Sequence, residues 1–488
     1  MFHPSPQQPG APMTPRATKI VATLGPASNT PEILQAIIEA GVNVVRLNFS
    51  HGTADEHRQR AAMVRAAAQS AGRVVGIMAD LQGPKIRVGK FAQGRVQLQT
   101  GQPFVLDAAR SLPGDETAVG LDYKSLPDEV QVGDVLLLND GLIVLQVLRL
   151  EGAAVHTEVL QGGELSNHKG INKRGGGLTA PALTAKDMED LKVAMALQVD
   201  FVAVSFPKDA ADMELARQLC HLANPDGPQP ALIAKIERAE AIPVLESIVL
   251  ASDGIMVARG DLAVEVGNAA VPALQKRMIR LAHAHDRFVI TATQMMESMI
   301  HAPMPTRAEV SDVANAVLDG TDAVMLSAET AAGKFPLETV REMALICEAA
   351  ERADRHDLES DFSGKTFTRI DQSIAMGALF TASHLGAKAI VALTESGSTA
   401  LWMSRHKVHI PIYALTPRLR AQRRMAVYRN VHPMLVDSST DRDTALAQAE
   451  QHLKARGIVA AGDVYAITCG EPMGTPGGTN MLRISRVG

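Results

Sequence analysis

The sequence has few cysteines, no long apolar run and little net charge. Its 488 residues include three cysteines, and the formal net charge is -5. Cys220, Cys347 and Cys469 lie far apart without a CxxC pair, so we expect neither a disulfide framework nor a zinc site, and a reducing cytoplasm fits best. No apolar stretch reaches the ~18 residues of a membrane span. The charge gives no reason to bind nucleic acid or an anionic membrane.

Two common phosphate-binding loops are also missing. The chain has no GxxxxGK[ST] segment and no GxGxxG segment after a predicted strand. The glycine run at 175–177 is too weak a signal, and a flexible loop is the simpler interpretation. A nucleotide would therefore have to be bound by scattered basic groups and a metal ion.

The composition is that of a globular protein. Apolar residues make up 46% and charged residues 21%, and the length suggests about three domains. The first fifteen residues are rich in proline and glutamine and lack the apolar core of a signal peptide. We expect a disordered tail over residues 1–16.

Eight short apolar runs alternate with amphipathic helical patterns. The runs are Lys19–Leu24, Asn43–Phe49, Val74–Ala79, Asp200–Phe206, Ala231–Ile236, Gly254–Ala258, Phe288–Ala292 and Asp322–Leu326. Continuously apolar strands between helices indicate a parallel sheet covered by helices. Eight units predict a closed (β/α)8 TIM barrel rather than an open, doubly wound sheet.

The alternation breaks once, after the third run. Residues 85–181 carry short alternating strands with glycine turns, which predicts an inserted small β-barrel. Its two thin connections, Gly83-Pro84 and Ala180-Pro181, would let it move as a lid. The barrel domain is then predicted in two parts, 17–84 and 182–353, and a C-terminal α/β regulatory domain over 366–488.

Polar residues follow the barrel strands at their C-terminal ends, where barrel enzymes place reactive groups. They are Arg46, Asn48 and Ser50 after the second run, Asp80 after the third, Lys235 and Glu237 after the fifth, Arg259, Gly260 and Asp261 after the sixth, Thr291, Thr293 and Gln294 after the seventh, and Ser327 and Glu329 after the eighth. The first and fourth runs contribute little beyond Thr23 and Ser205. Such convergence favours a catalytic centre over side chains that merely leave the core.

The residue types indicate the chemistry. Glu237 and Asp261 come from adjacent strands and could hold Mg2+ or Mn2+ shared with a substrate, the alternative being a carboxylate pair held by salt bridges. Lys235 points to the same side as Glu237 and suits charge that develops on a phosphoryl or enolate oxygen. Arg46 could hold a phosphate, and Gly260-Asp261 is expected to open a short helix that binds an anion. The site suits a small, doubly anionic substrate with a metal ion.

With these residues in place, the sequence resembles the pyruvate kinase family. The matching segments cover nearly the whole chain after residue 16: TKIVATLGPAS at 18–28, RLNFSHG at 46–52, DLQGPKIR at 80–87, KGIN at 169–172, KIE at 235–237, GIMVARGDL at 254–262, ATQMMESMI at 292–300 and DAVMLSAET at 322–330. The stretch KGINKRGGGL at 169–178 resembles the bacterial second-type enzymes more than the fructose-bisphosphate-activated ones.

The resemblance implies a glycolytic kinase that transfers the phosphoryl group of phosphoenolpyruvate to ADP, giving pyruvate and ATP. It also implies a cytoplasmic homotetramer with a small phosphorylated allosteric effector, and no nucleic-acid or membrane partner. Arg46 would bind the phosphoryl group, and Lys235 would stabilise that group and the enolate. The remaining roles it implies are metal binding by Glu237 and Asp261, carboxylate binding by Gly260, Asp261 and Thr293, enolate protonation near Thr293, Ser327 and Glu329, nucleotide binding by Asn48, Ser50, His51, Arg87 and Lys169, and a monovalent-cation site of Asn48, Ser50, Asp80 and the backbone of Leu81.

The sequence departs from the family pattern at two positions. Ala328 replaces a glycine, which matters only if that position needs a positive φ. Lys85 stands where many relatives have glutamate, so its ammonium is expected to take the place of K+ and to make turnover independent of added K+. The alternative is that Lys85 swings into solvent and leaves the K+ site intact.

The C-terminal domain contains a candidate effector loop. Thr394, Ser396, Gly397, Ser398 and Thr399 join a strand to a helix and are expected to cradle a phosphate, the alternative being an ordinary loop in which Ser398 caps the helix. Glu395 would repel a second phosphate, which favours a sugar monophosphate or AMP.

Two other functions compete with that of a pyruvate kinase. They are a Mg-dependent barrel lyase or aldolase that acts on a pyruvate enolate, and a non-catalytic metabolite sensor.

Overall fold

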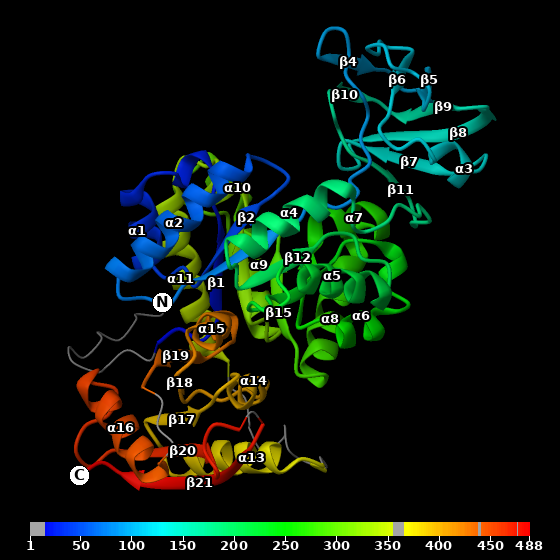
Figure 1. The fold of residues 1–488 in the computed structure, drawn as a ribbon. Coiled ribbons are helices and arrows are strands. Elements are labelled where there is room, and N and C mark those ends of the chain that lie inside the picture. The colour runs from blue at the N-terminus through cyan, green and yellow to red at the C-terminus, as the bar shows by residue number, and fades with distance from the viewer. Residues whose placement is uncertain (1–14, 355–365, 438–440, 476) are drawn as a thin grey trace. The chain divides into compact units, whose positions relative to one another are not determined.

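The computed structural model describes residues 15–354, 366–437, 441–475 and 477–488 (Figure 1). The chain divides into two compact units, one of residues 20–342 and one of residues 343–488 together with 1–19. Nearly all of the predicted N-terminal tail, residues 1–14, lies outside the described residues.

The first unit contains a closed barrel of eight parallel strands, which confirms the predicted fold class. In barrel order they are β1 (Lys19–Thr23), β2 (Val44–Asn48), β3 (Gly76–Asp80), β12 (Phe201–Val204), β13 (Ala231–Ile236), β14 (Gly254–Ala258), β15 (Phe288–Ala292) and β16 (Ala323–Leu326), and β16 closes against β1. Each predicted run has its strand, with bounds that agree to within two residues. Their side chains are almost all buried, as expected for strands that face both the barrel interior and the helices.

Helices surround this barrel (Figure 1). They are α1 (Pro31–Glu39), α2 (Ala54–Ser70), α4 (Ala185–Ala196), α5 (Ala210–Ala223), α6 (Leu245–Ala251), α7 (Arg259–Val266), α8 (Val271–Ala284), α9 (Arg307–Leu318), α10 (Ala328–Ala331) and α11 (Pro336–Ala353). Several begin at a threonine whose hydroxyl accepts the amide proton of the third helical residue: Thr53 with Glu56, Thr184 with Asp187, and Thr306 with Glu309. These caps fix where the loops that follow the strand ends stop. Ala328 is the first residue of α10 and has no positive φ, so the departure from glycine costs nothing there.

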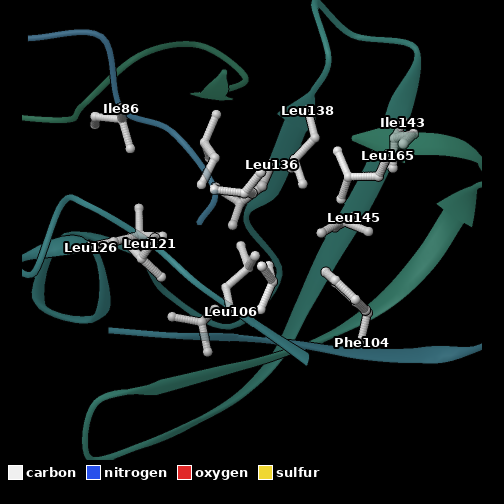
Figure 2. Close-up of a cluster of buried hydrophobic side chains, with 14 of the residues drawn as sticks. Ile86, Phe104, Leu106, Leu121, Leu126, Leu136, Leu138, Ile143, Leu145 and Leu165 are labelled. Carbon is white, nitrogen blue, oxygen red and sulfur yellow. The ribbon is translucent and has the colours of Figure 1, made fainter. Parts of the chain in front are cut away.

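The insertion consists mainly of β-strands, as predicted. Its strands are β4 (Arg95–Leu98), β5 (Pro103–Asp107), β6 (Ala118–Gly120), β7 (Val135–Leu138), β8 (Ile143–Glu151), β9 (Ala154–Gln161), β10 (Gly163–Ser166) and β11 (Ile171–Lys173), with a short helix α3 (Leu126–Glu129). The strands form a six-stranded sheet, β11-β7-β8-β9-β5-β6, and a two-stranded sheet, β10-β4. Figure 2 shows Phe104, Leu106, Leu136 and Leu145 in the single apolar core that both sheets enclose. The expected small barrel is therefore two sheets around one core, without a continuous ring of strand pairing among the described residues.

The second unit contains the predicted C-terminal α/β sheet. Its strand order is β19-β18-β17-β20-β21, with β21 antiparallel to β20 and the other neighbours parallel. The bounds are β17 (Ala389–Leu393), β18 (Ile412–Thr416), β19 (Val431–Leu435), β20 (Val464–Gly470) and β21 (Thr479–Arg486), and the helices are α13 (Ile370–His384), α14 (Ser398–Met403), α15 (Leu419–Arg424) and α16 (Arg442–Ala455). Across the described residues of both units, no helix has the length and apolar character needed to cross a membrane.

Candidate active site

Four charged side chains meet at the C-terminal ends of β2, β3 and β13. Arg46 Nε lies 2.5 Å from Asp80 Oδ2. Lys235 Nζ lies 3.2 Å from Asp80 Oδ1 and 3.0 Å from Glu237 Oε1. Asp80 thus has a cation on each oxygen, and it links residues that are far apart in the sequence.

Strand register produces this cluster. Asn48 at the end of β2 pairs with Asp80 at the end of β3, and Asp80 pairs with Ala203 of β12 on its other side. Because side chains alternate along a strand, Lys235 and Glu237 at β13 face the same way. The predicted convergence of these strand ends is confirmed for Arg46, Asp80, Lys235 and Glu237.

The charges in this cluster hold one another in place. Burial would raise the pKa of Asp80, but Arg46 and Lys235 lower it below its usual value, so the carboxylate stays ionised. Burial would lower the pKa of Lys235, but Asp80 and Glu237 raise it, so the ammonium stays charged. Glu237 differs, because burial, helped by Asp261 and Asp80 and opposed by Lys235, raises its pKa to about 7.

Two hydroxyls at the ends of β1 and β12 orient the cations of Arg46 and Lys235. Arg46 Nη1 donates to Thr23 Oγ1 at 3.1 Å, and Lys235 Nζ donates to Ser205 Oγ at 2.6 Å. Ser205 Oγ in turn donates to the Leu81 carbonyl at 2.7 Å. Thr23 and Ser205 are the two residues that the sequence named at the ends of β1 and β12. Which cation each one contacts depends on pairings across strands, which become visible only when the barrel is closed.

The ends of β14 and β15 form a second part of the site. α7 begins at Arg259, so the short helix predicted at Gly260-Asp261 is confirmed. The Gly260 amide donates to Thr293 Oγ1 at 2.8 Å. Thr293 and Gln294 both have a positive φ, of 67° and 53°, which no pattern in the sequence indicated.

Glu237 and Asp261 could hold a divalent cation between them. Among the described residues, no three or more His, Cys, Asp or Glu side chains are grouped to bind a metal ion. Two carboxylate ligands would leave further coordination positions to substrate and water, as Mg2+ sites in phosphoryl-transfer enzymes do. Lys235 and Lys85 place an ammonium group at each carboxylate, Lys85 Nζ lying 3.2 Å from Asp261 Oδ1. The two carboxylates are thus held by lysines, which is the alternative that the sequence left open, and a divalent metal at this pair stays a prediction.

Lys85 does not contact the residues that the resemblance assigns to K+. Its ammonium lies beside Asp261, with Asp140 Oδ1 at 3.9 Å, whereas the oxygens of Asp80 face Arg46 and Lys235. The side chain is 27% exposed, so it has not swung fully into solvent either. Lys85, Asp261, Gly260 and Gln294 line one cleft of about 650 Å³.

The candidate nucleotide residues fall into two groups. Asn48 ends β2 and Ser50 and His51 follow it, and the Ser50 amide donates to Asn48 Oδ1 at 3.1 Å. Arg87 and Lys169 lie side by side in the insertion, where Arg87 pairs with Gly170. Arg87 Nη1 also donates to the His168 carbonyl at 3.0 Å.

Glu329 binds backbone amides. Its carboxylate accepts from the Ser327 amide at 2.7 Å and from the Met296 amide at 3.3 Å, and burial raises its pKa. Glu329 thereby ties the loop after β15 to the end of β16. Its expected place near the enolate, like that of Ser327, stays a prediction.

The candidate effector loop is a tight turn between β17 and α14. Gly397 has φ 87° and is the N-cap of α14, and its amide donates to Thr394 Oγ1 at 2.9 Å. Ser398 is the first helical residue, so the alternative in which it caps the helix is wrong. Ser396 Oγ lies 3.2 Å from Ser398 Oγ, and Thr399 Oγ1 lies 2.8 Å from Thr479 Oγ1. Thr394, Glu395 and Thr399 line a pocket of about 60 Å³.

Fold and site together define a (β/α)8-barrel enzyme whose strand ends hold fixed cations beside paired carboxylates. The family models "Pyruvate kinase, barrel domain" and "Pyruvate kinase, alpha/beta domain" match residues 15–340 and 372–485. The chain belongs to the pyruvate kinase family and is a kinase, as the sequence resemblance predicted.

Individual relatives agree. Pyruvate kinase II of Salmonella typhimurium is 50% identical over 97% of this chain and 99% of its own. A pyruvate kinase of Haemophilus influenzae is 50% identical over 96% of this chain and 98% of its own. The crystal structure of a pyruvate kinase from Cryptosporidium parvum superimposes with a TM-score of 0.91 at 34% identity, covering 97% of this chain and 96% of that one.

The raised pKa of Glu237 predicts that metal affinity depends on pH. Below about pH 7 a proton competes with the metal for this carboxylate, so the affinity for Mn2+ should fall by about tenfold from pH 8 to pH 6. Calorimetric titration of the protein with Mn2+ in the absence of substrate measures this affinity. Glu237→Gln should bind more weakly and lose most of this pH dependence, and Asp261→Asn should bind more weakly while keeping it. An affinity of the unaltered protein that does not change with pH would contradict the assignment.

Proposed function

We propose that this protein transfers the phosphoryl group of phosphoenolpyruvate to ADP, yielding pyruvate and ATP in the last step of glycolysis. The observation that carries the proposal is the buried cluster of Arg46, Asp80, Lys235 and Glu237, in a chain half identical to pyruvate kinases along nearly its whole length. The comparisons give no support to a barrel lyase or aldolase, or to a non-catalytic sensor.

The cluster suggests how the residues divide the work. The P–O bond to the enolate oxygen breaks, a bond to a β-phosphate oxygen of ADP forms, and the enolate carbon takes a proton. Arg46 would hold the phosphoryl group, and Lys235 would offset the charge that grows on the enolate oxygen. Both cations are already oriented by Asp80, which avoids reorganisation during the reaction. Glu237 and Asp261 would hold Mg2+, which would supply further positive charge to offset the negative charge of the reacting groups.

The substrate carboxylate would lie at the start of α7. Gly260 and Asp261 lie in the first turn of α7, where backbone amides have no acceptor within the helix, and the Gly260 amide donates to the Thr293 hydroxyl. Protonation of the enolate is assigned to the side of Thr293 and Ser327, through water. Glu329 would serve this step by holding the surrounding backbone.

Wider assignments follow from the family. We infer a cytoplasmic homotetramer that uses Mg2+ or Mn2+ and binds neither nucleic acid nor membrane. Asn48, Ser50, His51, Arg87 and Lys169 would bind the nucleotide.

Replacing Lys235 tests the proposed chemistry. Lys235→Met should lower kcat by a factor that corresponds to ~3 kcal/mol or more, because the ammonium acts on the transition state. The assay couples pyruvate formation to consumption of phosphoenolpyruvate and ADP. Lys192→Met, which removes an exposed ammonium that faces Glu189 on α4, is the matched control. An effect confined to KM would show that Lys235 only binds substrate.

We further propose that turnover needs no added K+. Two observations support this: both oxygens of Asp80 already face cations, and Asn48 Oδ1 accepts an internal amide. Lys85 adds a fixed positive charge beside Asp261, although not beside Asp80. A mobile cation would therefore meet a site that is already neutralised.

Assays in tetramethylammonium buffer at constant ionic strength test K+ independence. Adding K+ should change the rate by much less than about tenfold, whereas Lys85→Glu should create a dependence on K+ because it reverses the fixed charge. Lys90→Glu, an exposed position in the insertion, controls for charge reversal alone. A large stimulation of the unaltered enzyme by K+ would exclude the idea.

The loop of residues 394–399 is proposed to bind the phosphate of an allosteric activator. Its hydroxyls and the Gly397 turn support this, and Glu395, although paired with Arg418 at 2.9 Å, would disfavour a second phosphate. The proposed activator is a sugar monophosphate or AMP.

Activation profiles distinguish the effectors. Glucose 6-phosphate or AMP should lower the KM for phosphoenolpyruvate, and Ser396→Asp should abolish the response by adding charge to the loop. Glucose without phosphate is the control ligand. Tight activation by fructose 1,6-bisphosphate would argue against a monophosphate site.

A further inference from the structure

The backbone at the end of β15 takes a conformation that its residues disfavour. Thr293 and Gln294 are consecutive and both lie in the left-handed region, with φ of 67° and 53°. A β-branched residue avoids this region, because its side chain crowds the backbone. Such strain persists only where surrounding groups enforce it.

The side chain of Arg259 supplies the enforcing contacts. Its Nη2 donates to the Thr293 carbonyl at 2.8 Å and to the Gln294 carbonyl at 3.2 Å, and its Nε reaches the Thr293 carbonyl at 3.3 Å. Nη2 also contacts Met295 Sδ at 2.8 Å. Arg259 is only 8% exposed, so these contacts compete little with water.

Asp312 of α9 fixes the guanidinium from the other side. Its Oδ1 accepts a hydrogen bond from Nη1 at 2.7 Å, and its Oδ2 lies 2.7 Å from Nη2 as an ion pair. The carboxylate therefore anchors the guanidinium group whose Nη2 donates to the two loop carbonyls. The loop is therefore held at its carbonyls by Arg259 and at the Met296 amide by Glu329.

These contacts determine where the Thr293 hydroxyl lies. Thr293 Oγ1 donates to the Ala292 carbonyl at 2.6 Å and accepts from the Gly260 amide at 2.8 Å. Gly260 directly follows Arg259. Gly260 thus offers its backbone amide to the Thr293 hydroxyl. The side chain of Arg259 binds the Thr293 backbone and so places that hydroxyl beside the amide.

We propose that Arg259, held by Asp312, is a positioning residue that keeps Thr293 and the start of α7 in the geometry that binds the substrate carboxylate. The inference rests on the proposed function, because it names what aligns that part of the site. Lysine cannot replace the arginine, since a single ammonium cannot reach both carbonyls and both carboxylate oxygens together.

Arg259→Lys and Asp312→Asn test the proposal, with Asp319→Asn as the matched control. Asp319 follows the same helix but pairs with Lys276 and Gln275, away from the site. In the first two variants KM for phosphoenolpyruvate should rise by about tenfold or more, and KM for ADP should change by less than about twofold. The control should resemble the unaltered enzyme.

Hydrogen exchange gives a readout that needs no substrate. Peptides covering residues 292–297 should exchange faster in Arg259→Lys and Asp312→Asn. Their exchange rate should be unchanged in Asp319→Asn. Asparagine tolerates a left-handed backbone better than glutamine does. The increase in exchange rate caused by Arg259→Lys should therefore be smaller in a Gln294→Asn background.

The outcomes separate this inference from the proposed function. If the unaltered protein does not convert phosphoenolpyruvate and ADP, the proposed function fails, while the exchange experiment still tests whether Arg259 holds the loop. If it does convert them, an unchanged KM for phosphoenolpyruvate in both variants, or equal changes for both substrates, overturns the inference. Should Arg259→Lys fail to fold, Asp312→Asn alone decides by the same measurements.

Discussion

The buried carboxylate of Asp80 is the constraint on which the active site depends. An isolated ion in the barrel interior would cost several kcal/mol, and Asp80 is stable there because Arg46 and Lys235 each face one of its oxygens. The three side chains come from β2, β3 and β13. The closed barrel therefore brings these three groups together, and losing one cation would leave a buried charge unpaired.

This arrangement also determines which ligands the site accepts. Arg46 and Lys235 carry two positive charges, of which Asp80 neutralises one, and Glu237 is the carboxylate whose pKa is poised near 7. A metal ion at Glu237 would leave Lys235 partly free for an anionic substrate. If Glu237 binds a metal ion as proposed, the cluster would couple metal binding to substrate binding through the ammonium group of Lys235.

The other half of the site is organised differently. Around Thr293 the geometry depends on an unfavourable backbone conformation whose carbonyls and amide are hydrogen-bonded by the charged side chains of Arg259 and Glu329. The cations of Arg46 and Lys235 suit the phosphoryl end of a phosphorylated carboxylic acid, and the rigid loop at Thr293 suits its carboxylate end. The insertion adds Lys85 beside Asp261, where it faces the proposed metal ligand.

The sequence alone determined the barrel and the identity of its charged residues, because apolar runs reveal strands and a polar residue at a strand end must emerge at the rim. It predicted Arg46, Lys235, Glu237 and Asp261 for this reason. Only the tertiary structure decided the partners: Ser205 for Lys235, Asp261 for Lys85, and Asp312 for Arg259. Such pairs depend on register between strands and helices far apart in the chain. The left-handed backbone at Thr293 was equally hidden, since neighbouring groups impose it against the local preference of the residues.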